Sequence, residues 1–186
     1  ERRHARGDLS IYSATAEQMR RLDALEIPWD VTPGVPAFAA AAAALRRELT
    51  IPQVAQTVIL TRYGRQASAM PAGEDLAGLA GHGATLVIHL GAQAIDEIAA
   101  TLAPQYGEEC PVAVVARASW PDELIVRGTL TTIAAAVQAA GVRRTATIVV
   151  GPALAAEGFS DSHLYSHARE RPATDGHPAA SERPEA

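Results

Sequence analysis

The sequence has almost no cysteine, few aromatic side chains and no large excess of either charge. One cysteine, Cys110, among 186 residues cannot form an internal disulfide, and this predicts a reducing, cytoplasmic setting. We expect its side chain to be buried because it precedes Pro111 at the start of an apolar run. Aromatic residues make up 4% of the chain, so a core must be built from Ala, Val, Leu and Ile. Such a core favours an α/β fold with helices close to a sheet.

Other absences exclude several classes of partner. The net charge of −5 argues against nucleic acid, because nucleic-acid-binding domains are normally basic. No apolar run approaches the ~20 residues of a membrane-spanning helix, so no membrane partner is expected. The first eight residues, ERRHARGD, lack the apolar stretch of a secretory signal. His163, His167 and His177 match no metal-site spacing, so we predict no metal and place them in or just before a disordered tail.

The most informative stretch is residues 31–45, VTPGVPAFAAAAAAL. Pro33-Gly34 predicts a tight turn, because proline presets φ and glycine tolerates positive φ. Pro36 fits the first turn of a helix, and the alanines at 39–44 have the highest helix propensity and little bulk. We therefore predict a thin helix to about Arg47. Either a neighbouring element or a ligand could lie close against it.

The rest of the chain alternates between apolar runs and helical patterns. Residues 57–61 (TVILT) are predicted to be a strand buried on both faces, and residues 118–122 a turn that makes its flanking strands antiparallel in a mixed sheet. Trp120 is expected to pack the end of that hairpin. The other strands are predicted at 27–31, 84–90, 111–116, 123–128 and 146–150, and the other helices at about 14–25, 74–80, 94–102 and 129–140.

Six segments occur in an order that resembles a known family. They are GDLSIYS, VTPGVPAFAAAAAA, LTIPQVAQTVILTRYG, ATLVIHLG, PVAVVARASWPDELIVRGTL and ATIVVG, which span about residues 7–151. This pattern resembles the tetrapyrrole methylases, the class III S-adenosylmethionine-dependent methyltransferases. Two of the segments, LTIPQVAQTVILTR and ASWPDELIVRGTL, look most like the members that methylate ring carbon 11 of precorrin-4 in cobalamin synthesis.

The resemblance implies an α/β fold of two domains with mixed sheets and an active site between them. Residues 1–52 would be the remainder of an incomplete amino-terminal domain, residues 53–152 the carboxy-terminal domain, and residues 153–186 an extension and a disordered tail. The family's first domain opens with a strand and a loop of the form GxGPGDP. That segment is absent here, so the chain is similar to the carboxy-terminal two-thirds of such an enzyme.

The resemblance also implies a methyl donor and the residues that bind it. S-adenosyl-L-methionine carries the reactive methyl group, so the protein need only bind and orient the reactants. No catalytic side chain is assigned. By position, the cofactor-binding residues would be Gly7, Asp8, Ile11, Pro36, Ala37, Leu90 and Ala118.

The implied substrate is a tetrapyrrole, a precorrin with many carboxylates. Arg62 is the expected carboxylate partner, because the arginine fork donates two parallel hydrogen bonds. Tyr63 and Tyr12 are the other candidate substrate-binding residues. Family members are dimers, which implies a homodimer. Two alternatives stay open: a truncated, non-catalytic fragment of such an enzyme, and a methylase that acts on another tetrapyrrole intermediate.

Overall fold

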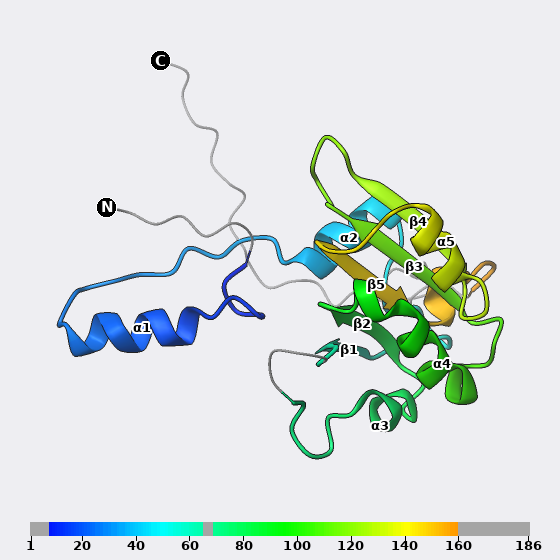
Figure 1. Cartoon of the computed structure of the whole chain (residues 1–186), viewed down its shortest axis with the longest axis horizontal. Coiled ribbons are helices and arrows are strands. Elements are labelled where there is room, and N and C mark those ends of the chain that lie inside the picture. The colour runs from blue at the N-terminus through cyan, green and yellow to red at the C-terminus, as the bar shows by residue number, and fades with distance from the viewer. Residues whose placement is uncertain (1–7, 65–68, 160–186) are drawn as a thin grey trace, which may run out of the picture.

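The computed structural model describes residues 8–64 and 69–159 (Figure 1). The described chain forms five helices and five strands, with short 3-10 turns at Ala92–Ala94 and Pro152–Leu154. The helices are α1 (Thr15–Ala24), α2 (Ala37–Leu45), α3 (Leu76–Ala80), α4 (Ile95–Tyr106) and α5 (Ile133–Ala139). The strands are β1 (Val58–Arg62), β2 (Thr85–His89), β3 (Pro111–Ala116), β4 (Leu124–Thr129) and β5 (Ala146–Val150).

The five strands form one mixed sheet in the order β1-β2-β5-β3-β4. β1 and β2 are parallel, and the other three neighbouring pairs are antiparallel. The predictions of an α/β fold with a mixed sheet and of an antiparallel β3–β4 pair are therefore confirmed. Because β5 is antiparallel to both β2 and β3, strands β1, β2 and β3 all end at the same edge of the sheet. We call it the carboxyl edge.

The central strands β2, β3 and β5 are largely apolar because both faces of the sheet are covered. Successive side chains of a strand point to opposite faces. Leu86 and Ile88 of β2 pack with α3, α4 and α5, whereas Val87 between them faces the other side. The same alternation holds in β3 and β5, so successive side chains of each strand contribute in turn to two cores, one on each face of the sheet.

The alanine helix α2 covers part of the second face, as Figure 1 shows. Ala41 is 0% exposed and Leu45 is 3% exposed, and they pack with Val87, Val115 and Val149. The backbone of a helix with such small side chains can lie close to the strands. The predicted helix is thus confirmed, and the neighbouring element that lies against it is the sheet.

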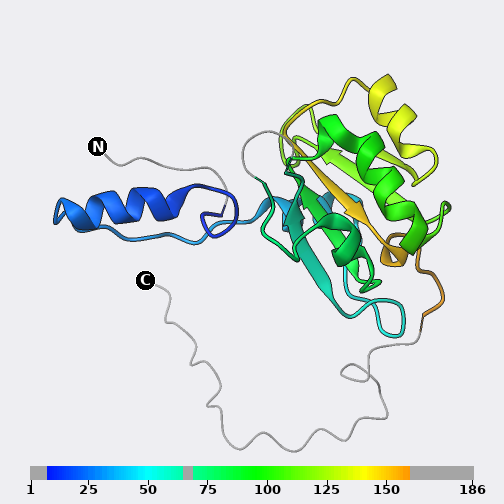
Figure 2. The same ribbon diagram turned by 60° about the horizontal axis from the view of Figure 1, so that its bottom comes forward.

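The predicted strand at residues 27–31 is wrong. This segment is extended but has no strand partner among the described residues, and Ile27, Trp29 and Val31 are exposed. Helix α1, which precedes it, forms as predicted, yet none of its residues is buried. Figures 1 and 2 show both lying away from the sheet. Alternating apolar residues make a strand only where a neighbouring strand accepts their hydrogen bonds.

Other details also differ from the predictions. β1 is an edge strand in which only Thr61 is buried; Ile59 packs against one core and Val58 and Leu60 against the other, so the strand is only partly buried on its two faces. α4 runs to Tyr106, beyond the predicted end at residue 102. Pro104 lies in its last turn and does not end the helix. Cys110 is 7% exposed, as predicted. Within residues 8–64 and 69–159, no helix is long and apolar enough to cross a membrane.

Candidate functional site

A cavity of about 850 Å³ lies at the carboxyl edge of the sheet. Its walls come from the ends of β1, β2 and β3, the beginning of β5, the beginning of α2 and the segment before α1. Ligands of α/β proteins commonly bind outside the carboxyl ends of strands, and ligand pockets span roughly 300–1,000 Å³. The cavity therefore has the place and the size of a small-molecule site.

Nine of the ten predicted site residues line this one cavity. They are Asp8, Ile11, Tyr12, Pro36, Ala37, Arg62, Tyr63, Leu90 and Ala118. The tenth, Gly7, lies outside the described residues. These residues are spread over more than 100 positions of the sequence, and the fold brings them to one edge of the sheet. Their roles in binding stay predictions.

The beginning of α2 presents main-chain donors to the cavity. Pro36 is the residue before the first turn, and among the described residues no side chain caps it. The first N–H groups of a helix lack partners within the helix and form a partial positive pole. Asp8 lies on the same cavity. Hydrogen bonds from the Ser10 hydroxyl and main-chain N–H, with a smaller one from Gly34, hold the pKa of its carboxyl below its usual range.

The backbone around the cavity contains several residues with positive φ that are not glycine. Leu90, at the end of β2, has φ 59°, and its side chain is 71% exposed. Tyr12, Arg117, Ser119 and Thr145 also have positive φ, and all of them line the cavity. Such conformations disfavour side chains with a Cβ atom and gather at functional sites. An exposed leucine held in this way presents an apolar surface to whatever occupies the cavity.

Tyr12 and Arg62 are electrostatic neighbours. Burial raises the pKa of the Tyr12 phenol, and the charge of Arg62 partly opposes that shift. The Tyr12 ring also packs on the ring of His89, with centroids 5.3 Å apart and planes at 54°. His89 was missed by the sequence analysis, although it is the last residue of β2. Its Nε2 atom is buried without a hydrogen-bond partner in the described structure, and burial lowers its pKa.

Tyr63 joins the cavity wall to helix α4. Its hydroxyl donates to Oε2 of Glu97 at 2.8 Å, and its main-chain N–H donates to the carbonyl of His89 at 2.9 Å. The ring therefore lines the cavity while the hydroxyl anchors the loop. Trp120 differs from its predicted role at the hairpin end: its side chain is 47% exposed and lines the cavity.

The comparisons with known proteins agree with this geometry. The profile of the family described as Tetrapyrrole (Corrin/Porphyrin) Methylases matches residues 3–134. The chain belongs to the tetrapyrrole methylase family. It is 59% identical over 165 residues to a precorrin-4 C(11)-methyltransferase of Rhodococcus erythropolis, and 60% identical over 164 residues to one of Mycobacterium tuberculosis. These matches cover 89% and 88% of this chain but only 66% and 65% of the two relatives.

Solved structures of tetrapyrrole methylases share the fold. The cobalt precorrin-4 methyltransferase CbiF, a cobalamin biosynthetic enzyme, superposes with a TM-score of 0.77 at 39% identity, covering 80% of this chain and 62% of that one. A uroporphyrin-III C-methyl transferase from Thermus thermophilus, complexed with S-adenyl homocysteine, has a TM-score of 0.64 at 25% identity, covering 80% and 64%. The chain is thus shorter than the family members to which it is similar.

A tetrapyrrole methylase needs room for its methyl donor, and the cavity passes that test. Ala37 and Ala118 are small, Leu90 presents an apolar surface, and uncapped N–H groups begin α2. This combination suits a ligand with an apolar part and a carboxylate. In the described structure, no group of three His, Cys, Asp or Glu side chains could hold a metal ion.

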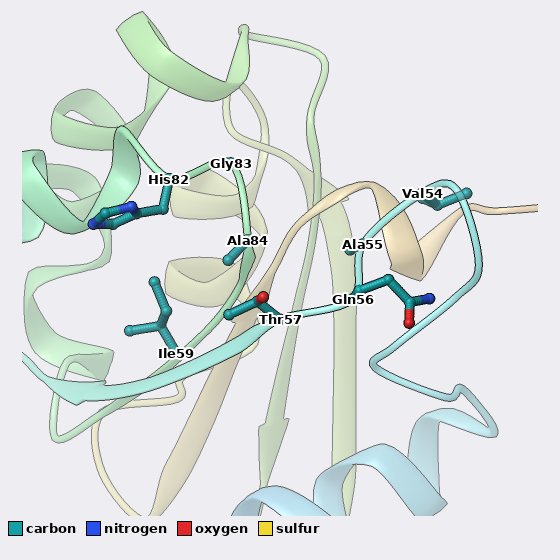
Figure 3. Close-up of a pocket in the computed structure, with 8 residues that line it drawn as sticks. All are labelled: Val54, Ala55, Gln56, Thr57, Ile59, His82, Gly83 and Ala84. Atoms are coloured by element: carbon teal, nitrogen blue, oxygen red, sulfur yellow. The ribbon is translucent and has the colours of Figure 1, made fainter.

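A second pocket, of about 530 Å³, lies at the opposite edge, where β1 and β2 begin (Figure 3). Thr57 and Ala84 lie between the loop at residues 54–56 and the turn that carries His82 and Gly83. It contains no predicted site residue and none of the residues of positive φ around the first cavity. The larger cavity is therefore the candidate site.

Proposed function

We propose that the chain carries out, or contributes most of the site for, methyl transfer from S-adenosyl-L-methionine to ring carbon 11 of precorrin-4 or its cobalt form. The observation that carries this proposal is the convergence of nine predicted residues on one cavity at the carboxyl edge. The names of the relatives at 59% and 60% identity support the choice of substrate. A methylase acting on another tetrapyrrole intermediate is the alternative within the family.

In this proposal the protein binds and orients, and the donor supplies an electrophilic methyl group on a sulfonium sulfur. Asp8 and Ile11, the beginning of α2 at Pro36 and Ala37, and the apolar Leu90 and Ala118 hold the donor. Tyr12, Arg62 and Tyr63 face the tetrapyrrole. Placing two bound reactants in a fixed orientation can supply several kcal/mol of a reaction barrier, on the order of 7–11 in favourable cases.

A second candidate function rests on the length of the match. Because the chain spans only 66% and 65% of the two relatives, it could be a fragment that keeps the fold but binds no cofactor. Calorimetric titration with S-adenosylhomocysteine separates the two. Saturable binding that is weakened by Leu90→Asn supports the methyltransferase. A folded chain that takes up no S-adenosylhomocysteine supports the fragment.

We further propose that the chain forms a homodimer in the cytoplasm. Several large apolar side chains are exposed outside the cavity, among them Leu25 at 67% and Ile27 at 46%. Pairing two copies would cover such surface. Sedimentation velocity at micromolar concentration should give a dimer, and a stable monomer would contradict this part of the proposal.

A further inference from the structure

Positive charge gathers at the cavity of a chain that is acidic as a whole. Arg62, Arg117, Arg143 and Arg144 line the cavity, whereas Asp8 is the one carboxylate among its lining residues. Because Arg117 is paired with Asp122, the three other arginines less Asp8 leave an excess of two positive charges at the cavity, against a net charge of −5 for the chain. Such local concentration of one sign attracts ligands of the opposite sign.

The four arginines differ in how the protein holds them. Nε of Arg117 lies 2.6 Å from Oδ2 of Asp122, so its charge is already paired. Arg62 donates to the carbonyl of Ala69. Arg143 and Arg144 lie in the connection between α5 and β5, are exposed, and make no hydrogen bond or ion pair with any described residue. Their guanidinium groups are available to a ligand.

The order of the strands sets the distance between these charges. Arg62 ends β1, and Arg144 comes two residues before β5, with β2 between the two strands. Neighbouring strands lie about 4.8 Å apart, so the end of β1 and the beginning of β5 are separated by roughly 10 Å. A ligand with acidic groups at two separated places can meet both at once.

We propose that Arg143 and Arg144 form a carboxylate-binding pair for the acidic side chains of the tetrapyrrole, on the far side of the cavity from Arg62. The proposal rests on the function proposed above and names a second anchoring point for its substrate. The arginine fork can donate two parallel hydrogen bonds to each carboxylate. The two anchors would fix the orientation of the ring system.

The cofactor also carries a carboxylate, which is a second possible ligand of Arg143 and Arg144. S-adenosyl-L-methionine has only one, and the uncapped N–H groups at the beginning of α2 already suit it. That leaves no second carboxylate on the cofactor for the arginines on the other side of β2 from Arg62. A polycarboxylate ring can, and this favours the tetrapyrrole.

The test uses the whole 186-residue chain and uroporphyrin III, a stable tetrapyrrole with carboxylates around its ring. Its binding is followed by fluorescence, and binding of S-adenosylhomocysteine is measured separately by calorimetry. The test variant is R143Q/R144Q. The matched control is R20Q/R21Q, which removes two adjacent exposed arginines from α1, outside the cavity, and changes the net charge equally. Thermal unfolding checks that both variants fold.

We expect R143Q/R144Q to bind uroporphyrin about tenfold more weakly, equivalent to roughly 1.4 kcal/mol, with a smaller dependence on salt than the unsubstituted chain. R20Q/R21Q should bind as the unsubstituted chain does, and S-adenosylhomocysteine affinity should not change in either variant. The proposal would be overturned if the two variants lost uroporphyrin affinity equally or if R143Q/R144Q lost none. It would also be overturned if the unsubstituted chain did not bind uroporphyrin. A loss confined to S-adenosylhomocysteine would overturn it in favour of a cofactor contact. Failure of the proposed function is distinct, because it would abolish S-adenosylhomocysteine binding in every variant.

Discussion

Gly91 lies where the fold has no room for a methyl group, so Gly91→Ala should destabilise it measurably. The residue is buried directly after β2, beside Leu90 at the cavity. A Cβ atom there would lie 2.5 Å from Cδ1 of Ile98 and 3.2 Å from Cδ1 of Ile148. Carbon atoms in contact are normally about 3.5–4.0 Å apart. The Ile98 methyl group would therefore have to move by roughly 1 Å, which is the gap between those distances.

The size of the effect follows from the surroundings. Ile98 is 1% exposed and Ile148 is 0% exposed, so neither side chain can turn toward solvent. Overpacking a close-packed core costs about 1–3 kcal/mol. Loss of glycine freedom in the unfolded state offsets about 0.4–1 kcal/mol. We expect Gly91→Ala to lower the free energy of unfolding by about 1–2 kcal/mol in urea titrations followed by circular dichroism.

A double-mutant cycle tests the cause. Ile98→Val removes the Cδ1 atom that the new methyl group would meet, and alone should cost about 0.5–1.5 kcal/mol. The double variant should lose about 1 kcal/mol less than the sum of the two single losses, because the closest of the clashes is gone. Strictly additive losses would refute the overpacking argument, and a fully stable Gly91→Ala would refute the placement of Gly91 itself.

Three further predictions concern the cavity and the core. Leu90→Asn should leave the free energy of unfolding unchanged, because asparagine tolerates positive φ. It should weaken S-adenosylhomocysteine binding by roughly tenfold in calorimetry, because an apolar contact is lost. Unchanged affinity would show that Leu90 does not touch the cofactor. Burial lowers the pKa of His89 in the folded chain, so the unfolded chain takes up the proton first as pH falls below about 6.5, and stability declines. His89→Leu should flatten that decline in urea titrations at several pH values, and the exposed His82→Gln should not. Burial raises the pKa of the Cys110 thiol to about 11, so a thiol reagent at neutral pH should label it only after urea unfolds the chain.

The sheet could be predicted from the sequence because its central strands are buried on both faces. β2, β3 and β5 are dominated by Val, Ile, Leu and Ala, and this pattern does not depend on which elements cover them. The alanine helix α2 was predictable for a similar reason, since its helix propensity is local. Residues 27–31 show the limit: their alternation is that of a strand, but the described chain gives them no neighbour.

The candidate site was only partly predictable. The family resemblance named residues before α1, at the beginning of α2 and at the ends of β1, β2 and β3, and nine of them line one cavity. His89, Arg143 and Arg144 were missed because nothing local distinguishes them. A histidine that ends an apolar strand and two arginines in a loop become informative only when the strand order places them at the same edge. That order is a long-range property that no short stretch of sequence encodes.

Alanine has no rotatable side-chain torsion, and this has a consequence for how α2 responds to a ligand. When Ala41 packs against the sheet it loses no side-chain rotamer freedom, so the entropy cost of ordering it comes from the backbone alone. For the same reason, the contact has no side-chain rotation with which to absorb a displacement. A ligand that moves Pro36 and Ala37 at the cavity would therefore move Ala41 and Leu45 with them, as a rigid shift of the helix over the strands.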